Sequence, residues 1–306
     1  MNRSELGLGL WQAGGGFGFW EDQNRKDSLQ VLHKAIRSDI IHYDTAQSYG
    51  NGTSEQLLGQ QCKRFQATKP RNSFFFATKL QSQIPDKVEQ LVGKSLRRLC
   101  TDYLDLLYLH WPSSGKDPRY MLDAMRKDKR IKYIGVCNFP PALLAQLLKD
   151  TALDYFQCPI SLLWTRHLSE LLHLCKERNI KIVGYSPLGM GLLSGKHSLP
   201  PDDARSNLYC YQIPQAYKAF LDLTALLSEI ASKHAATATQ IALSWSLDQQ
   251  AQVILTGARN KEQLDTSLMA KELILTEAEK NSLKEAAEIL QRQAPAEMDN
   301  IFAHQW

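Results

Sequence analysis

Short apolar runs alternate along the chain with longer amphipathic stretches. Eight of these runs have the length of buried strands: Leu6–Leu10, Ile40–Tyr43, Phe74–Thr78, Leu104–Leu109, Tyr133–Cys137, Tyr155–Cys158, Ile180–Tyr185 and Val253–Leu255. Each run is short, and the stretch that follows it changes period, which indicates strands rather than segments of long helices.

The stretches between the runs show the period of an amphipathic helix. Asp27–Arg37, Asp86–Leu99 and Arg166–Arg178 carry apolar residues at the i, i+3, i+4, i+7 spacing of a helix with one buried face. Gln240–Leu247 and Thr276–Leu290 have the same character. The last of them opens with Thr276 and, three residues later, Glu279, which is the pattern of a capping box.

Alternating strands and helices predict a parallel sheet. Eight strands in 306 residues favour closure into a (β/α)8 TIM barrel, and a doubly wound open sheet is the alternative. Because no Pro- or Ser-rich linker divides the chain, we expect one domain over residues 1–306. The irregular segment 194–214 follows the seventh strand, which predicts an active-site loop, and a helix and tail occupy about 276–306.

Composition narrows the class of protein. The hydrophobic fraction of 43% is enough for a large core, and the net charge of only +4 gives no electrostatic case for a nucleic-acid partner. No uncharged stretch reaches the roughly 18 apolar residues that a membrane span needs. The N-terminus lacks a continuous apolar core and does not resemble a signal peptide. The six cysteines include no CxxC pair, which indicates reduced thiols in a cytoplasmic protein.

Polar side chains end three consecutive strands. Asp44, Lys79 and His110 close the second, third and fourth apolar runs, and Tyr49 follows Asp44 by five residues. Taken singly, each has an ordinary structural explanation, such as a turn, a solvated loop or a satisfied histidine. In a barrel, however, the carboxyl ends of the strands form the active site, so we expect the four to meet there.

These residue types suit proton donation to a carbonyl. A tyrosine titrates at about 10, and a nearby ammonium favours the phenolate and lowers that pKa. A carboxylate would hold the lysine in place, and a neutral histidine can orient a carbonyl oxygen by donating a hydrogen bond. A metal site is not expected, because His167, His173 and Cys175 point in different directions on a helix.

Several motifs, taken in order, resemble those of the aldo-keto reductases over nearly the whole chain. They are GLGLW (Gly7–Trp11), YDTAQSYGNGTSEQLLG (Tyr43–Gly59), ATK (Ala77–Lys79), DYLDLLYLHWP (Asp102–Pro112), IGVCNF (Ile134–Phe139), YSPLGMGLLSGK (Tyr185–Lys196) and TGARNKEQL (Thr256–Leu264). The resemblance implies a (β/α)8 barrel that binds NADPH without a Rossmann domain and reduces a small aldehyde or ketone. No GxGxxG motif occurs, which agrees with that implication.

The resemblance assigns roles to positions of this chain. It implies a catalytic set of Asp44, Tyr49, Lys79 and His110, with Tyr49 as the general acid. The cofactor-binding residues it implies are Trp11, Asn138, Gln157, Tyr185, Ser186, Leu188, Gly191, Lys196, Gly257, Arg259 and Gln263. Among them, the resemblance places Ser186 and Leu188 at the pyrophosphate, and Arg259 and Gln263 at the adenosine 2′-phosphate and adenine. Trp20, Trp111 and Phe139 are expected to line the substrate pocket, since an aromatic lining suits flat or apolar carbonyl compounds.

The chain departs from the family pattern at four places. Leu10 replaces the usual Thr, Cys137 the usual Ser, and Thr256 the usual Pro before the cofactor-binding glycine. Thr266-Ser267 replaces the Glu-Asn pair that contacts adenine. The last change is expected to weaken the adenine pocket and leave only moderate NADPH affinity.

Two other functions are open alternatives. A barrel aldolase would use Lys79 as a Schiff base, although a neighbouring Asp44 would keep that amine charged. A cofactor-binding regulatory subunit with vestigial reductase activity, similar to the potassium-channel β subunits, would also keep the four residues. For the reductase, the expected partner is a small-molecule carbonyl substrate, and a monomer is favoured.

Overall fold

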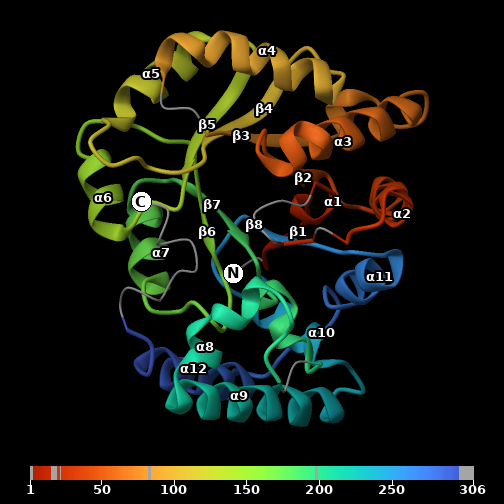
Figure 1. Cartoon of the computed structure of the whole chain (residues 1–306), viewed down its shortest axis with the longest axis vertical. Coiled ribbons are helices and arrows are strands. Elements are labelled where there is room, and N and C mark those ends of the chain that lie inside the picture. Colours follow the sequence, from red (N-terminus) through yellow and green to blue (C-terminus); the bar gives the residue numbers. More distant parts are fainter. Residues whose placement is uncertain (1–2, 15–18, 21, 82–83, 197–198, 296–306) are drawn as a thin grey trace.

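Eight parallel strands close into a barrel in the computed structural model, which describes residues 3–14, 19–20, 22–81, 84–196 and 199–295 (Figure 1). The strands are β1 Glu5–Gly9, β2 His42–Asp44, β3 Phe75–Leu80, β4 Leu104–Leu109, β5 Ile131–Cys137, β6 Tyr155–Pro159, β7 Lys181–Tyr185 and β8 Val253–Thr256. The first strand pairs with the last, with Glu5 opposite Val253. This pairing confirms the barrel and excludes the doubly wound open sheet.

The helices form the outer layer. They are α1 Trp11–Gly14, α2 Arg25–Arg37, α3 Thr53–Arg64, α4 Val88–Leu99, α5 Pro118–Lys127, α6 Pro141–Leu147, α7 Leu168–Glu177, α8 Tyr209–Gln212, α9 Pro214–Lys233, α10 Ala238–Leu247, α11 Lys261–Met269 and α12 Glu277–Arg292. The long helices α9 and α12 pack side by side at one edge of the molecule (Figure 1). None of the helices in the described part of the chain is both long and apolar enough to cross a membrane.

Local sequence explains where several helices begin. The capping box at Thr276 and Glu279 is present at the start of α12, as expected. Thr237 and Gln240 form a second capping box, so α10 begins before the predicted Gln240. The sequence analysis did not identify α9, although Pro214 stands at its start and buried residues recur along it at helical spacing.

The interior of the barrel is filled by side chains from the strands. Tyr108 is wholly buried there, and Gly135 on the neighbouring strand gives its ring room. A Cβ at Gly135 would lie 2.8 Å from the Tyr108 ring and 2.5 Å from the Tyr155 carbonyl oxygen. The interior of the barrel is therefore a packed core.

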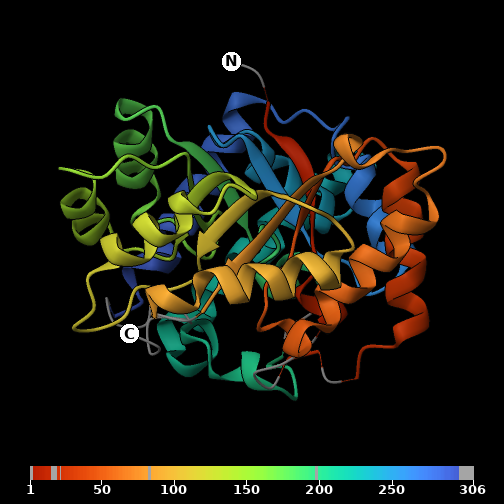
Figure 2. The ribbon, with the colours of Figure 1, turned by 90° about the horizontal axis from the view of Figure 1, so that it is seen from above.

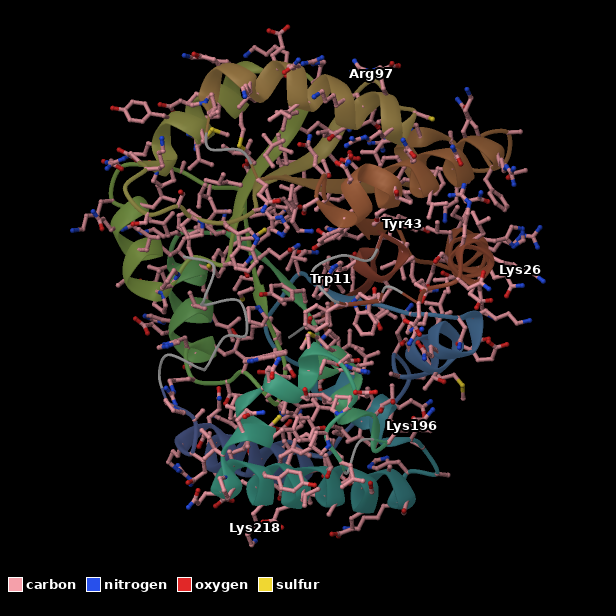
Figure 3. The ribbon with its side chains drawn as sticks, viewed as in Figure 1. Trp11, Lys26, Tyr43, Arg97, Lys196 and Lys218 are labelled. Carbon is pink, nitrogen blue, oxygen red and sulfur yellow. The ribbon has the colours of Figure 1, made fainter. Side chains whose placement is uncertain are left out.

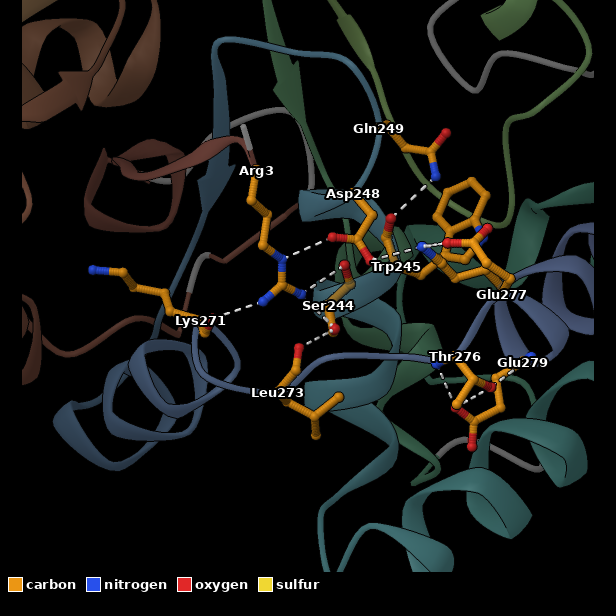
Figure 4. A network of polar contacts seen from close by, with 11 residues as sticks. Arg3, Ser244, Trp245, Asp248, Gln249, Lys271, Leu273, Thr276, Glu277 and Glu279 are labelled. Atoms are coloured by element: carbon orange, nitrogen blue, oxygen red, sulfur yellow. Dashed lines mark hydrogen bonds and ion pairs between the residues drawn. The ribbon is translucent and has the colours of Figure 1, made fainter. Parts of the chain in front are cut away.

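A clamp around Arg3 joins the beginning of the chain to its C-terminal helices (Figure 4). The Arg3 guanidinium donates to the Asp248 carboxylate at 2.8 Å, to the Lys271 carbonyl at 2.6 Å and to the Ser244 carbonyl at 3.1 Å. The Arg3 side chain is 19% exposed and that of Asp248 is 17% exposed, so water screens the pair only in part. The clamp lies beside the β1–β8 seam.

The segment predicted as an irregular active-site loop contains short helices. Ala204–Asn207 forms a 3-10 turn, α8 follows, and α9 begins at Pro214, while residues 197–198 lie outside the described part. In Figure 2 this segment (teal) lies at the bottom and the N-terminal end of β1 at the top. The segment thus lies at the carboxyl ends of the strands, where an active-site loop was expected.

Candidate active site

A cavity of about 740 Å³ opens at the carboxyl ends of the strands. Most of the residues that the resemblance assigned to the site line it: Trp11, Trp20, Asp44, Tyr49, His110, Trp111, Asn138, Gln157, Tyr185, Ser186, Leu188, Gly191, Lys196, Gly257, Arg259 and Gln263. In Figure 3, Trp11 lies at the centre of the view, whereas Lys26 points outward from the periphery.

A buried ion pair lies at the base of this cavity, where Asp44 lines the cavity wall and Lys79, although expected in the site, is buried and does not. The Lys79 ammonium donates to Oδ1 of Asp44 and, at 2.9 Å, to the carbonyl of Thr45. The other carboxylate oxygen of Asp44 accepts from Nε2 of Gln157 at 2.8 Å. Because β2, β3 and β6 each contribute one of these side chains, the barrel itself fixes the pair.

Tyr49 stands over this ion pair on a tight turn. The Lys79 ammonium lies 5.0 Å from the centre of its ring, and the His110 ring lies 5.8 Å away, edge to face. Trp11 stacks on the same tyrosine ring, with 6.2 Å between ring centres. The structure thus brings together all four residues that the sequence analysis expected to meet.

A contact between two glycines sets the position of the turn. Gly50 has φ +56°, and a Cβ there would lie 2.3 Å from the carbonyl oxygen of Gly14. The backbone at the end of α1 therefore touches the backbone that follows Tyr49. Only glycine fits this crossing, and the crossing holds Trp11 against Tyr49.

The protonation states in this cluster follow from burial and from one cation. Burial raises the pKa of Tyr49 to about 12, even though the Lys79 ammonium acts to lower it. The pKa of Tyr49 is therefore raised, whereas the ammonium taken without burial predicts that it is lowered. Burial and the Lys79 charge hold the pKa of His110 well below its ordinary range, so the ring is neutral.

Lys79 itself stays charged. Burial disfavours its ammonium, but the Asp44 carboxylate outweighs that effect and holds the pKa of Lys79 above its ordinary value. The cluster at neutral pH therefore holds a protonated phenol, an ammonium paired with a carboxylate, and a neutral imidazole.

Amide side chains lie next to this cluster. The Tyr185 hydroxyl donates to Oδ1 of Asn138 at 2.6 Å, and the Asn138 amide nitrogen donates to the His110 carbonyl at 3.1 Å. The Cys137 thiol lies 3.6 Å from Oε1 of Gln157, in the position where the family has a serine. Cys137 thus replaces that hydroxyl as a weak donor.

Backbone strain is concentrated around the cavity. Trp20, Asn138, Ser186 and Met190 all line it, and all have φ between +52° and +65°. L residues rarely adopt this left-handed region, and such strain is most common at functional sites. Ser186 and Met190 stand in the segment that the resemblance assigns to the cofactor pyrophosphate.

The far end of the cavity is polar. Gln263 accepts from the backbone N–H of Arg259 at 2.8 Å. The hydroxyls of Thr256 and Ser267 lie 3.0 Å apart, so two departures from the family pattern bond to each other. Gly257 lies against the end of the Gln12 side chain, and a Cβ there would lie 2.1 Å from the Gln12 amide nitrogen, so that side chain would have to move.

The structure places some residues differently from the sequence expectation. Phe139 is 1% exposed, packs in the hydrophobic core and does not line the cavity. Phe139 lies beyond the end of β5 and after Asn138, whose φ of +65° ends the strand alternation, so the aromatic composition of the motif did not reveal where its ring packs. His167 and His173 are exposed, whereas Cys175 is buried, so they do not share one site.

Sequence reasoning also missed residues that line the cavity. They include Gln12, Phe19, Met190, Arg205, Asn207, Leu208, Thr237 and Thr239. Arg205 is bonded to Asp203 and, at 3.0 Å, to the Met190 carbonyl. The glycine- and aromatic-rich run before Trp20 was the available signal for Phe19. Arg205, Asn207 and Leu208 lie in the predicted active-site loop 194–214, but nothing in the sequence indicated which residues of that loop face the cavity.

The sequence profile described as "Aldo/keto reductase family" matches residues 5–288. The chain belongs to the aldo/keto reductase family. The "NADH-specific methylglyoxal reductase" of Escherichia coli (strain K12) is 29% identical to this aldo/keto reductase, over 94% of this chain and 96% of the relative. "Aldo-keto reductase yakc [NADP(+)]" of Schizosaccharomyces pombe is 28% identical to it, over 84% of this chain and 82% of the relative.

Solved structures agree with the fold of this aldo/keto reductase. The glycerol dehydrogenase AKR11B4 from Gluconobacter oxydans superposes with a TM-score of 0.80, at 27% identity over 96% of this chain and 94% of that one. The chain is thus an oxidoreductase of a carbonyl-reducing family that uses nicotinamide cofactors.

Proposed function

We propose that this aldo/keto reductase transfers a hydride from NADPH to the carbonyl of a small aldehyde or ketone, reversibly, with Tyr49 as the general acid. The observation that carries the proposal is the meeting of Tyr49, Lys79, Asp44 and His110 at the base of one cavity. The six free thiols support a cytoplasmic location.

The cavity residues fit a nicotinamide dinucleotide. Asn138, Gln157 and Tyr185 supply amide groups and an aromatic ring beside the cluster, and Arg259 supplies a cation at the far end. Within the described residues, Nδ1 of His110 is buried without a hydrogen-bond partner. A buried polar atom of this kind at a cavity wall is what a site built for a polar ligand leaves open. When bound, the dinucleotide supplies the hydride.

The protein residues would manage the proton and the developing charge. His110, being neutral, can donate a hydrogen bond that orients the carbonyl oxygen. Tyr49 holds its proton at neutral pH and gives it to that oxygen as negative charge develops there. The Lys79 ammonium stabilises the phenolate that remains, and Asp44 holds the ammonium in place. A charged Lys79 is a poor nucleophile, which argues against an aldolase.

The decisive experiment replaces Tyr49 by phenylalanine. We expect Tyr49→Phe to lower single-turnover reduction of a good aldehyde by at least about 10², the lower end for loss of a general acid. NADPH binding, measured by protein fluorescence, should persist because the ring remains. Tyr120→Phe makes the same change at a 68% exposed side chain on α5 and should leave the rate unchanged. Turnover near the wild-type value in Tyr49→Phe would show that the proton comes from elsewhere.

A further inference from the structure

The guanidinium of Arg259 is held by the segment that follows β1. Its Nη2 lies 2.7 Å from the Asp22 carboxylate, and its Nε donates to Oε1 of Gln23 at 3.2 Å. Gln23 returns a hydrogen bond from its amide to the Arg259 carbonyl at 2.8 Å. The guanidinium carbon also lies 6.0 Å from the Trp20 ring centre. Trp20, Asp22 and Gln23 thus form one rim of the cavity together with Arg259, which lies more than 230 positions further along the sequence.

These contacts occupy one edge of the guanidinium. The Nε and Nη2 groups form the side-on pair of donors that can hold a phosphate or a carboxylate with two parallel hydrogen bonds. Asp22 and Gln23 already accept from this pair. A phosphate that approached this edge would have to displace the Asp22 carboxylate, which carries the same sign of charge.

Arg205 is a second cation near this end, with its guanidinium carbon 5.5 Å from the Trp20 ring centre, but Asp203 and the Met190 carbonyl already accept from it. The other groups at this end of the cavity offer a phosphate little positive charge. Gln263, Thr266 and Ser267 line it and are neutral. Lys261, the next cation along the chain, does not line the cavity and lies 3.8 Å from the Glu262 carboxylate. The binding of an additional phosphate at the adenosine end therefore depends on how much of Arg259 is available.

We propose that Asp22 sets the dinucleotide preference of this enzyme by competing with the adenosine 2′-phosphate for Arg259. The inference rests on the proposed function and adds a residue outside the cavity wall to it. NAD(H) has a hydroxyl where NADP(H) has the phosphate, so its binding does not require Arg259 to leave Asp22. The Asp22–Arg259 pair therefore reduces the preference for NADP(H) over NAD(H) that an unpaired arginine at this position would give.

The effect of Asp22 should be several-fold rather than overwhelming. Its side chain is 75% exposed and that of Arg259 is 37% exposed, so water screens the pair. An exposed ion pair changes an equilibrium by up to about fivefold, and loss of the repulsion between the carboxylate and the phosphate adds to this. The pKa of Asp22 is lowered by its hydrogen bond to Arg259, so the carboxylate is ionised at neutral pH.

The test is a titration of both dinucleotides without turnover. Quenching of tryptophan fluorescence, to which Trp11 and Trp20 at the cavity contribute, gives the Kd of NADPH and of NADH. We expect Asp22→Asn to lower the Kd of NADPH by about three- to tenfold and that of NADH by less than about twofold. In an Arg259→Ala background the same substitution should have a smaller effect, since there is no guanidinium to release.

Asp203→Asn is the matched control. It removes a carboxylate of the same charge from the same rim, where its partner is Arg205. If it shifts the ratio of the two Kd values as much as Asp22→Asn does, general rim charge is responsible and the inference is wrong. It is also wrong if Asp22→Asn leaves the ratio unchanged or weakens NADPH binding, since the pair would then only position Arg259.

Two further outcomes separate this inference from the function on which it rests. If neither dinucleotide binds the wild-type chain, the proposed function fails and the inference fails with it. If both bind and only the Asp22 effect is missing, the proposed function stands and the inference alone fails. Asp22→Ser is a second neutral variant, and it must shift the ratio in the same direction as Asp22→Asn for the inference to hold.

Discussion

Lys79 controls how readily Tyr49 can give up its proton. Burial is the main cause that raises the pKa of Tyr49, and the Lys79 ammonium is the group that acts to lower it. Asp44 keeps the ammonium charged, although Lys79 is only 1% exposed. The acid strength of the site thus depends on one buried cation, which in turn depends on one carboxylate.

Removal of that cation should therefore weaken the acid. In Lys79→Met the pKa of Tyr49 should rise further, and single-turnover reduction should fall by about 10² or more. Lys218→Met makes the same change at a 79% exposed side chain on α9 and should leave the rate unchanged. A Lys79→Met enzyme with the wild-type rate would contradict the role of the ammonium.

The pH profile of reduction follows from the same values. Tyr49 must be protonated to donate, and with a pKa of about 12 it stays protonated throughout the neutral range. His110 must be neutral, and its lowered pKa keeps it so. We expect kcat for reduction to be flat between about pH 6 and 9, where an unperturbed histidine would titrate. Stopped-flow hydride transfer at a series of pH values measures this, and a midpoint within that range would contradict the assignment.

The residue scale also shows what the sequence could and could not predict. The ends of apolar runs placed Asp44, Lys79 and His110 at one mouth, because strands in a parallel barrel all end on the same side. The pKa of Tyr49 could not be read in this way, since burial depends on packing from the whole fold. The contact of Asp22 with Arg259 joins residues 237 positions apart, and no local pattern specifies such a pair.

At the scale of elements, periodicity predicted the strands better than the helices. Most strand residues are buried in the closed barrel, and exposed or polar residues stand mainly at the strand ends, as with Glu5 and Lys181, so the apolar runs remain visible in the sequence. Helices such as α3 carry buried polar groups, and in α3 the Glu55 carboxylate accepts from Thr78 and pairs with Arg98. A polar residue on the inner face blurs the hydrophobic pattern, and only the structure shows that its partners satisfy it.

The crossing of α1 and the Tyr49 turn gives a prediction at this scale. In Gly50→Ala the new Cβ would meet the Gly14 backbone and must push the turn away. A displacement of about 1 Å at a catalytic group costs roughly 10² in rate, so kcat should fall by about that factor while the Kd of NADPH changes little. Steady-state kinetics and the fluorescence titration separate the two quantities.

Gly115→Ala is the matched control for that substitution. Gly115 has φ +69°, similar to Gly50, but a Cβ there would have no atom within 4 Å. It reproduces the backbone strain without the clash. If Gly115→Ala lowered kcat as much as Gly50→Ala, strain in a loop rather than the glycine crossing would explain the loss.

At the scale of the whole molecule, stability depends on how the barrel closes. The Arg3 clamp ties the start of β1 to the end of α10 and to the residues after α11. Hydrogen bonds between charged groups in partly buried sites contribute about 1.5 to 3 kcal/mol each to the free energy of unfolding. The clamp is one of the contacts that stabilise the pairing of β1 with β8.

We therefore expect Arg3→Ala to lower the free energy of unfolding by about 2 kcal/mol. Urea denaturation measures this as a lower midpoint at an unchanged m-value. Arg119→Ala is the comparison, because Arg119 also pairs with aspartates but its side chain is 42% exposed, so its removal should shift the urea midpoint much less than Arg3→Ala does. Equal losses in the two variants would show that the clamp adds nothing beyond an ordinary surface pair.

The seam that the clamp secures joins segments that a ribosome makes at very different times. Glu5 pairs with Val253, and Arg3 bonds to Lys271. At about 5 to 20 residues per second, β1 exists for roughly 12 to 50 seconds before β8 has been synthesised. Throughout that time one edge of β1 has no strand beside it, and an unpaired edge is a template for pairing with another chain. The geometry that makes the finished barrel free of sheet edges thus leaves the nascent chain most exposed to aggregation until β8 has been made.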